Sequence, residues 1–396
     1  MLHSLRHIHL FPKRMRVLML ASVAWFTAEC ALEFALPTYL QSAGLGYADI
    51  GALVSLVSVG ALLVDLPAGA LADKVNRGRM MAAGLVLAVL SSWLLFWAKD
   101  VLVLAPVLVA WGASYQLWKV PRDASLAALT TKKRRSEFYG IDTELTYLAA
   151  AAGPIIGGAL LAWAGYSSLL WFYTVALLAA AALALHASHN KGGRELKPRL
   201  LLSPLKEAAH ATPRIILLLL LAAGLAAFWE MVWTLQPLFY SAAGLSPVLG
   251  GMLMAAFSLP AVFLGMPLGR LADRHGKRRV LLAGMLLMGT GILAFSTAQG
   301  FELMVVGALA VSAGGAGCLP ALEGLVMDWA SGRKKGVVAG WMDFFIDAGF
   351  IAGPLAGGLA AQAWGLSEAF AAAGLMLIAV AAIGVIASLF AAKAKR

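Results

Sequence analysis

The chain has 396 residues, of which 61% are hydrophobic and only 13% are charged, and its mean hydropathy is +0.83. Soluble globular domains have a smaller apolar share, so this composition excludes an ordinary soluble domain. The formal net charge of +11 is explained by basic loops beside anionic lipid headgroups, and we expect no nucleic-acid partner.

Twelve apolar runs follow one another along the chain, each long enough to cross a bilayer. Backbone groups in lipid must bond internally, and the alternating pattern of a membrane barrel is missing, so we predict helices. The expected fold class is an all-α membrane protein with twelve transmembrane helices. The runs cover about 16–40, 48–68, 79–98, 101–121, 138–162, 168–187, 214–240, 247–268, 278–298, 302–327, 336–362 and 368–391.

The distribution of basic residues predicts the orientation. Of the 31 Lys and Arg residues, we assign only Lys99 to the side reached by the odd-to-even connections. The positive-inside rule then places both termini in the cytoplasm. We expect a multi-pass protein of a bacterial-type cytoplasmic (inner) membrane, monomeric and surrounded by membrane lipids.

Carboxylates inside the spans give the strongest chemical signal. An ionised carboxylate at the bilayer centre costs roughly 2.5 to 3.5 kcal/mol. Because no Lys, Arg or His lies at mid-span, these groups should be protonated or face a wet cavity, and some should exchange protons. The carboxylates are Glu29 and Glu33 in the first span, Asp65 in the second, Glu230 in the seventh, Glu323 in the tenth, and Asp343 and Asp347 in the eleventh.

Spacing predicts which polar groups share a helical face. Glu29 and Glu33 are four residues apart, and they continue a stripe that begins at Ser22 and Trp25 and should face the bundle axis. Asp343 and Asp347 are also four apart. Each pair is therefore expected to act together in binding a proton or a substrate.

Two halves of the chain align at an offset of 200 residues. GALADKVNRGR (Gly69–Arg79) returns as GRLADRHGKRR (Gly269–Arg279), and GPIIGG (Gly153–Gly158) returns as GPLAGG (Gly353–Gly358). Pro37 and Gly44 likewise match Pro237 and Gly244. Repeats at one offset indicate a duplicated six-helix unit. The predicted domains are an N-terminal bundle over 1–187, a cytoplasmic linker over 188–213 and a C-terminal bundle over 214–396.

The offset also pairs the acids of the first span with aromatic rings. Trp229 and Trp233 occupy the positions equivalent to Glu29 and Glu33. Carboxylates and indole faces together bind organic cations, each ring contributing about 0.5 to 2 kcal/mol. Packing or a lipid-facing position is the alternative use of the two tryptophans.

Two further polar groups have structural alternatives. Asp65 either serves coupling or gating, or pairs with Lys119 or Arg122 at the end of the fourth span. Arg122 and the adjacent Asp123 are expected to form an ion pair at the membrane surface.

GALADKVNRGR resembles the GxLaDrxGrr loop signature of the major facilitator superfamily, and GRLADRHGKRR is its second copy. The resemblance implies two six-helix bundles related by a pseudo-twofold axis. It also implies a cytoplasmic latch from Asp73, Arg77 and Arg79 to the eleventh helix near Gly336. We expect the glycine to permit close helix approach and Asp73 to lie at a helix N-terminus. The predicted gating residues are Gly69, Asp73, Arg77, Arg79, Gly269, Asp273 and Arg274.

The segment AAAAGPIIGG (Ala149–Gly158) looks like the GxxxGPxxGG signature of exchangers and efflux pumps of this superfamily, and GFIAGPLAGG (Gly349–Gly358) is a fuller version. The likeness implies export, with close helix packing as the alternative. Drug exporters of this type usually bury an arginine in mid-helix four, and here that helix offers only Lys119 and Arg122 at its end. The predicted pivot residues are Gly153, Pro154, Gly157, Gly353, Pro354 and Gly357.

These features together predict a proton-coupled antiporter that exports a cationic or amphipathic small organic solute by alternating access. We expect no enzymatic activity, no cofactor and no resident metal, with the proton gradient as the energy source. Three alternatives remain: a divalent-metal or metallophore exporter with Cys30, Cys318 or Met231 as softer ligands, a lipid or glycolipid flippase, and a non-transporting receptor or scaffold.

Overall fold

The computed structural model describes residues 11–98, 100–130, 135–187, 213–330 and 335–393. These residues are almost entirely helical, and no strand occurs among them. Eleven helices in the described ranges are long and apolar enough to cross a membrane. One of them is two helices joined by a kink at Ala164 and Gly165, so the described residues contain the twelve predicted spans.

The chain folds into two compact units. Unit 1 contains Met1–Pro198 and Tyr240–Met252, and unit 2 contains Arg199–Phe239 and Leu253–Arg396. Of the predicted linker 188–213, only Pro213 lies within the described residues, where it begins a helix. Lys99 also lies outside the described residues. The predicted domain boundaries therefore stay a prediction.

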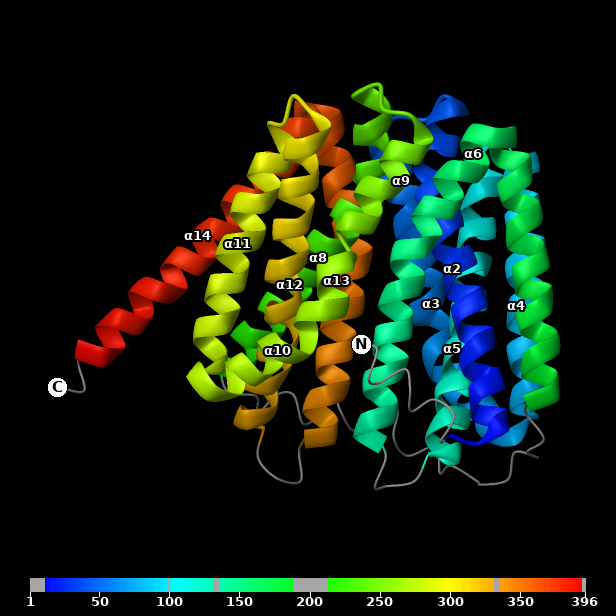
Figure 1. The fold of residues 1–396 in the computed structure, drawn as a ribbon, viewed down its shortest axis with the longest axis horizontal. Coiled ribbons are helices and arrows are strands. Elements are labelled where there is room, and N and C mark those ends of the chain that lie inside the picture. Colours follow the sequence, from blue (N-terminus) through cyan, green and yellow to red (C-terminus); the bar gives the residue numbers. More distant parts are fainter. Residues whose placement is uncertain (1–10, 99, 131–134, 188–212, 331–334, 394–396) are drawn as a thin grey trace. The chain divides into compact units, whose positions relative to one another are not determined.

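The helices are shown in chain order, from blue to red, in Figure 1. The first half forms α2 (Lys13–Ser42), α3 (Tyr47–Lys74), α4 (Arg77–Trp97), α5 (Val101–Leu129) and α6 (Arg135–Ala187). The second half forms α8 (Pro213–Ala242), α9 (Pro247–Ala256), α10 (Leu259–His275), α11 (Lys277–Ser296), α12 (Phe301–Trp329), α13 (Lys335–Trp364) and α14 (Leu366–Lys393).

The helix boundaries repeat at the predicted offset of 200. α2 and α8 begin at residues 13 and 213 and end at 42 and 242. Each is followed by a glycine with positive φ, Gly44 at 93° and Gly244 at 70°, a conformation that glycine adopts without steric cost. Gly165 and Gly365 repeat this feature at 69° and 105°. The duplicated six-helix unit is thus visible in the backbone as well as in the sequence.

The predicted pivot glycines bring helices into close contact within each unit. A β-carbon at Gly153 of α6 would lie 2.6 Å from Cβ of Cys30 and 2.7 Å from the carbonyl oxygen of Thr27, both on α2. Gly353 of α13 is placed equally tightly against Ala227 of α8. Small residues at these positions let the helix backbones approach. The packing alternative has direct structural support here, and the export reading of this motif stays a prediction.

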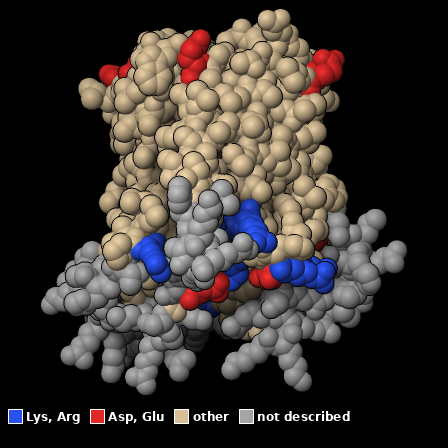
Figure 2. Space-filling view, turned by 90° about the vertical axis from the view of Figure 1, so that its left-hand side faces the viewer, with Lys and Arg blue, Asp and Glu red and all other residues tan. Residues whose placement is uncertain are grey.

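Basic side chains are confined to one end of the face drawn in Figure 2, where some acidic side chains also lie. The visible Lys and Arg side chains gather at one end, and the opposite end shows only Asp and Glu. This separation is what the positive-inside rule requires of a multi-pass protein.

Membrane orientation can be tested with epitope tags. Tags at residues 195 and 396, both outside the described residues, are expected to be accessible from the cytoplasm, and a tag at residue 245 from the opposite side. Accessibility of the tags in intact and permeabilised cells measures this. Opposite locations for the tags at 195 and 396 would contradict an even number of spans between them.

Candidate functional site

Two polar faces meet in unit 1, one on α2 and one on α5. The α2 face is the predicted stripe of Ser22, Trp25, Glu29 and Glu33. The α5 face carries side chains at the spacing i, i+4, i+7 and i+11, which also places them on one side of a helix. Its members are Trp111, Tyr115, Trp118 and Arg122. The two faces contact each other in antiparallel order, and α6 supplies partners at both ends of the array.

The first end of the array is built around Arg122. Its Nε donates a 2.9 Å hydrogen bond to Ser22 Oγ, and its guanidinium pairs with Asp123 at 2.7 Å. It also forms a short ion pair with Asp142 of α6. The side chains of Arg122 and Asp142 are only 12% and 14% exposed. Arg122, whose side chain is mostly enclosed, therefore ties α2, α5 and α6 together.

These contacts bear on two expectations. The expected Arg122–Asp123 pair is confirmed, and Asp142 and Ser22 also enclose the guanidinium. Arg122 lies in the last third of α5, as expected of an arginine at the end of the fourth span. The alternative that pairs Arg122 with Asp65 is wrong, because the guanidinium is occupied by the other carboxylates. Among the described residues, half-buried Asp65 has no ion pair or hydrogen bond.

The second end of the array is built around Glu29, which is 3% exposed. The hydroxyl of Tyr173 on α6 donates a 2.8 Å hydrogen bond to Glu29 Oε2. The indole N–H of Trp111 in turn donates to the Tyr173 hydroxyl oxygen at 2.9 Å. No ion pair found between described residues includes Glu29. The carboxylate is therefore held by a chain of neutral hydrogen-bond donors. The bond from Trp111 polarises the Tyr173 hydroxyl and so strengthens the hydrogen bond from Tyr173 to Glu29.

Aromatic rings occupy the middle of the array. The ring centroid of Trp25 lies 5.1 Å from that of Tyr115 and 5.6 Å from that of Trp118. Tyr115 is near enough to Glu29 and Glu33 for their charges to act on its phenol. Trp118 is fully buried, and its indole N–H finds no hydrogen-bond acceptor among the described residues. A buried donor of this kind ordinarily indicates water or a ligand close by.

Glu33 lies one turn beyond Glu29 on the same face of α2. It is half-buried, and the charges of the two carboxylates interact. The structure therefore brings together the four residues of the predicted α2 stripe.

Unit 2 contains a second group of carboxylates. Glu323 on α12 and Asp343 on α13 are exposed in this unit and lie close enough for their charges to interact. Glu230 and Asp347 are half-buried on α8 and α13. Two like charges held near each other favour a proton or a cation between them.

The two tryptophans of α8 are half-buried. The indole of Trp229 packs directly on Gly315 of α12, leaving no room for a side chain there. The packing alternative therefore applies to Trp229 within unit 2. The predicted pairing of Trp229 and Trp233 with the acids of α2 stays a prediction.

The first gating loop has a different architecture from the expected one. Asp73 lies in the last turn of α3, which ends at Lys74, so the prediction of a helix N-terminus is wrong. The next helix begins at Arg77, and Asn76 caps it by accepting a 3.1 Å hydrogen bond from the Arg79 N–H. Asp73 is stabilised instead by Arg77, 3.6 Å away.

Close helix approach is also not found at the loop glycines. No described atom lies within 4 Å of a β-carbon position at Gly69 or Gly269. Packing within each unit therefore does not account for glycine at either position, and the expected close approach stays a prediction. The predicted bridge from the loop to the start of α13 stays a prediction.

The two copies of the loop share a contact at equivalent positions. Arg77 donates a 3.1 Å hydrogen bond to the carbonyl oxygen of Ala124, and Lys277 donates one of 3.3 Å to that of Gly324. Lys277 also pairs with Asp328 at 2.7 Å. Asp273 and Arg274 are exposed. One basic side chain at the end of each loop thus connects the start of α4 to α5 and the start of α11 to α12.

Neutralising Asp73 should loosen the first loop. Asp73→Asn removes the carboxylate 3.6 Å from Arg77, in a pair whose side chains are 19% and 23% exposed. A single long ion pair of this kind contributes about 1 kcal/mol, so folding should be retained. We expect more frequent opening on the side of this loop, measured as faster thiol labelling of engineered cysteines. Glu302→Gln, which changes an exposed carboxylate in the first turn of α12, is the control, and equal labelling rates in the two variants would contradict a latch at Asp73.

Several members of the array are not among the predicted site residues. These are Tyr173, Trp111 and Asp142, the partner of Arg122. The spacing of Trp111, Tyr115, Trp118 and Arg122 was a usable signal, because it repeats the periodicity of the α2 stripe. The partners on α6 carry no comparable local signal.

The described residues contain no group of three or more His, Cys, Asp or Glu side chains placed to hold a metal ion. Cys30 and Cys318 are both buried, and neither forms a disulfide between described residues.

Known proteins resemble this chain along its whole length. The family model described as Major Facilitator Superfamily matches residues 17–252 and 218–395. The tetracycline resistance protein, class G, of Vibrio anguillarum is 29% identical over 329 residues, covering 77% of this chain and 78% of that protein. The quinolone resistance protein NorA of Staphylococcus aureus is 27% identical over 132 residues, 33% of this chain and 34% of NorA.

Solved structures show the same fold. The nucleoside transporter NupG matches with a TM-score of 0.78 at 13% identity, covering 95% of this chain and 99% of NupG. A bacterial homologue of the human lysosomal transporter Spinster matches with a TM-score of 0.74 at 16% identity, covering 94% and 95%. From its helices, its repeat and the family match, the chain belongs to the major facilitator superfamily and is a membrane transporter, not an enzyme.

Proposed function

We propose that this transporter is a proton-coupled antiporter that exports a small cationic or amphipathic organic solute by alternating access. The observation that carries the proposal is Glu29. Its carboxylate is buried in a membrane span, accepts a hydrogen bond from Tyr173 and is included in no ion pair found between described residues. A carboxylate in that setting is suited to exchange a proton for a cation.

The surroundings of Glu29 support an organic cation as the exchanged solute. Glu33 adds a second negative charge next to it. Trp25 and Tyr115 present aromatic rings on the same array, and aromatic faces attract cations. Glu323 and Asp343 in unit 2 form another acidic pair that favours a positively charged solute.

The names of the relatives support the direction of transport. The Vibrio anguillarum and Staphylococcus aureus proteins are named for resistance to tetracycline and to quinolones. A membrane transporter most simply confers resistance by moving the drug out of the cell. We carry this direction over to the present chain as part of the proposal.

Reconstituted vesicles test the proposal directly. An imposed pH gradient should drive tetraphenylphosphonium against the direction of proton flow, and a protonophore should abolish this movement. A sodium gradient of the same size should drive none. Movement of Mn²⁺ or of a fluorescent phospholipid without movement of tetraphenylphosphonium would instead favour the metal-exporter or flippase alternative and contradict the proposal.

A further inference from the structure

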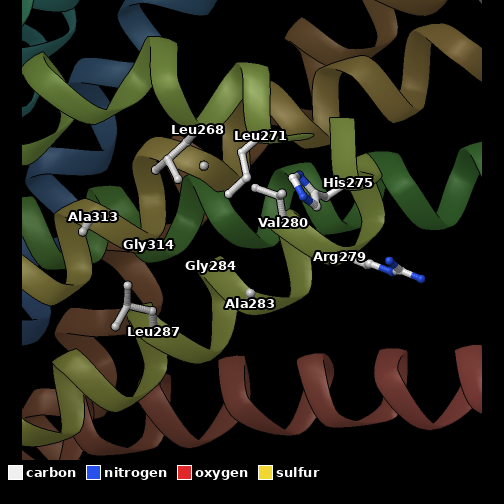
Figure 3. A pocket seen from close by; sticks show the side chains of 11 residues that line it. Leu268, Leu271, His275, Arg279, Val280, Ala283, Gly284, Leu287, Ala313 and Gly314 are labelled. Carbon is white, nitrogen blue, oxygen red and sulfur yellow. The ribbon is translucent and has the colours of Figure 1, made fainter. Parts of the chain in front are cut away.

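An apolar groove lies in unit 2 between α10, α11 and α12 (Figure 3). Its volume is about 370 Å³. Leu271 and Leu287 on its rim are 41% and 43% exposed, so the groove opens at the surface of the unit. Its apolar lining is formed by Leu268, Leu271, Val280, Ala283, Gly284, Leu287, Ala313, Gly314 and Gly317.

One end of the groove is basic. His275 ends α10 and Arg279 lies in the first turn of α11, and both line the groove. In Figure 3 the Arg279 side chain extends away from Leu268 and Leu271 beyond the end of the apolar lining. The groove therefore has an apolar part that can hold an acyl chain and a cationic end that can bind an anionic headgroup.

The charge of Arg279 is available for a ligand. Its neighbours are engaged: Lys277 pairs with Asp328 at 2.7 Å, and Arg278 donates a 2.9 Å hydrogen bond to the carbonyl oxygen of Gly384. For Arg279 and His275, no ion pair or side-chain hydrogen bond is found within the described part of the chain. Both basic groups at the groove are therefore unengaged, whereas Lys277 and Arg278 are not.

The internal repeat shows that the groove is a specific feature of unit 2. The equivalent region of unit 1 is a packed apolar cluster in which Ala68 and Met80 are buried and Leu117 packs against them. At an offset of 200, the position of Leu117 is Gly317. Leu117 helps to fill this space in unit 1. Gly317 has no side chain, so the equivalent space in unit 2 stays partly open.

We propose that this groove binds one anionic phospholipid, with an acyl chain between α10, α11 and α12 and the phosphate against Arg279 and His275. Basic pockets between transmembrane helices recognise acidic headgroups, and the apolar lining offers a polar solute no hydrogen bonds. The site is separate from the array around Glu29, and it concerns lipid recognition rather than transport chemistry.

Native mass spectrometry of the delipidated protein tests the site with two probes, dioleoylphosphatidylglycerol and dioleoylphosphatidylcholine. We expect the first to bind at least fivefold more tightly. Arg279→Gln should weaken phosphatidylglycerol binding about fivefold, the effect of one basic contact, and leave phosphatidylcholine unchanged. The matched control is Arg79→Gln at the equivalent position of unit 1, which should bind both lipids as the parent does.

Filling the groove should remove binding of both lipids. Gly317→Leu restores the unit 1 residue, although its β-carbon would approach Val280 to 3.2 Å. If that variant does not fold, Ala283→Leu fills the groove from an exposed position of α11. Equal affinity of the parent for the two lipids, or unchanged phosphatidylglycerol binding in a folded groove-filling variant, would overturn the proposal.

Discussion

Replacing Glu29 with glutamine is expected to reduce pH-driven uphill transport at least tenfold while leaving downhill exchange of substrate measurable. Glutamine keeps the shape of the side chain and can still accept the hydrogen bond from Tyr173, but it fixes the site in a neutral state. A carrier that cannot release its proton cannot couple proton flow to substrate movement. Transport into reconstituted vesicles, with and without a pH gradient, separates the two activities.

Two further variants locate the effect at the carboxylate. Tyr173→Phe removes the donor and leaves the acid, so it should retain pH-driven transport at a reduced rate. Glu302→Gln changes an exposed carboxylate in the first turn of α12 and should transport as the parent does. Full uphill transport by Glu29→Gln would assign a structural role to Glu29. The coupling group would then have to be sought at Glu33, Asp65, Asp343 or Asp347.

Replacing Arg122 with methionine is expected to cause the largest loss of stability, on the order of 3 kcal/mol. Methionine retains much of the side-chain volume but leaves Asp142, which is 14% exposed, as a buried carboxylate without its partner. Removing one member of a buried pair is far more damaging than removing both. The thermal unfolding midpoint of the purified protein measures the effect.

A second substitution and a matched control separate charge from packing. Asp142→Asn combined with Arg122→Met should recover most of the lost stability, because the stranded charge is gone. Lys277→Met breaks the pair with Asp328, which is 56% exposed, and should change the midpoint little. A double variant as unstable as Arg122→Met would show that the loss comes from packing or from the hydrogen bond to Ser22.

Most of the fold could be predicted from the sequence because its determinants are local. A run of about 20 apolar residues must form a helix in lipid, and the offset of 200 residues recurs in the helix boundaries. The kink at Gly165 and its counterpart Gly365 follow from the same repeat. None of these features depends on knowing which helices touch.

Only the part of the site that lies on a single helix could be predicted from the sequence. Spacing placed Trp25, Glu29 and Glu33 on one face, and the structure agrees. Tyr173 lies 144 residues from Glu29 along the chain, and no local pattern connects the two. The environment of Arg122 depended in the same way on Asp142 of another helix. The helical position of Asp73 was missed because α3 continues through Lys74, with Asn76 capping the next helix.

Proton release on substrate binding is the most direct test of the central claim that buried carboxylates exchange protons for a cation. Tetraphenylphosphonium is added to the purified protein in weakly buffered detergent, and the change in pH is followed with an indicator dye. We expect proton release by the parent, a loss of that release in Glu29→Gln, and normal release in the control Glu302→Gln. Cation binding by the parent without any proton release would contradict the account.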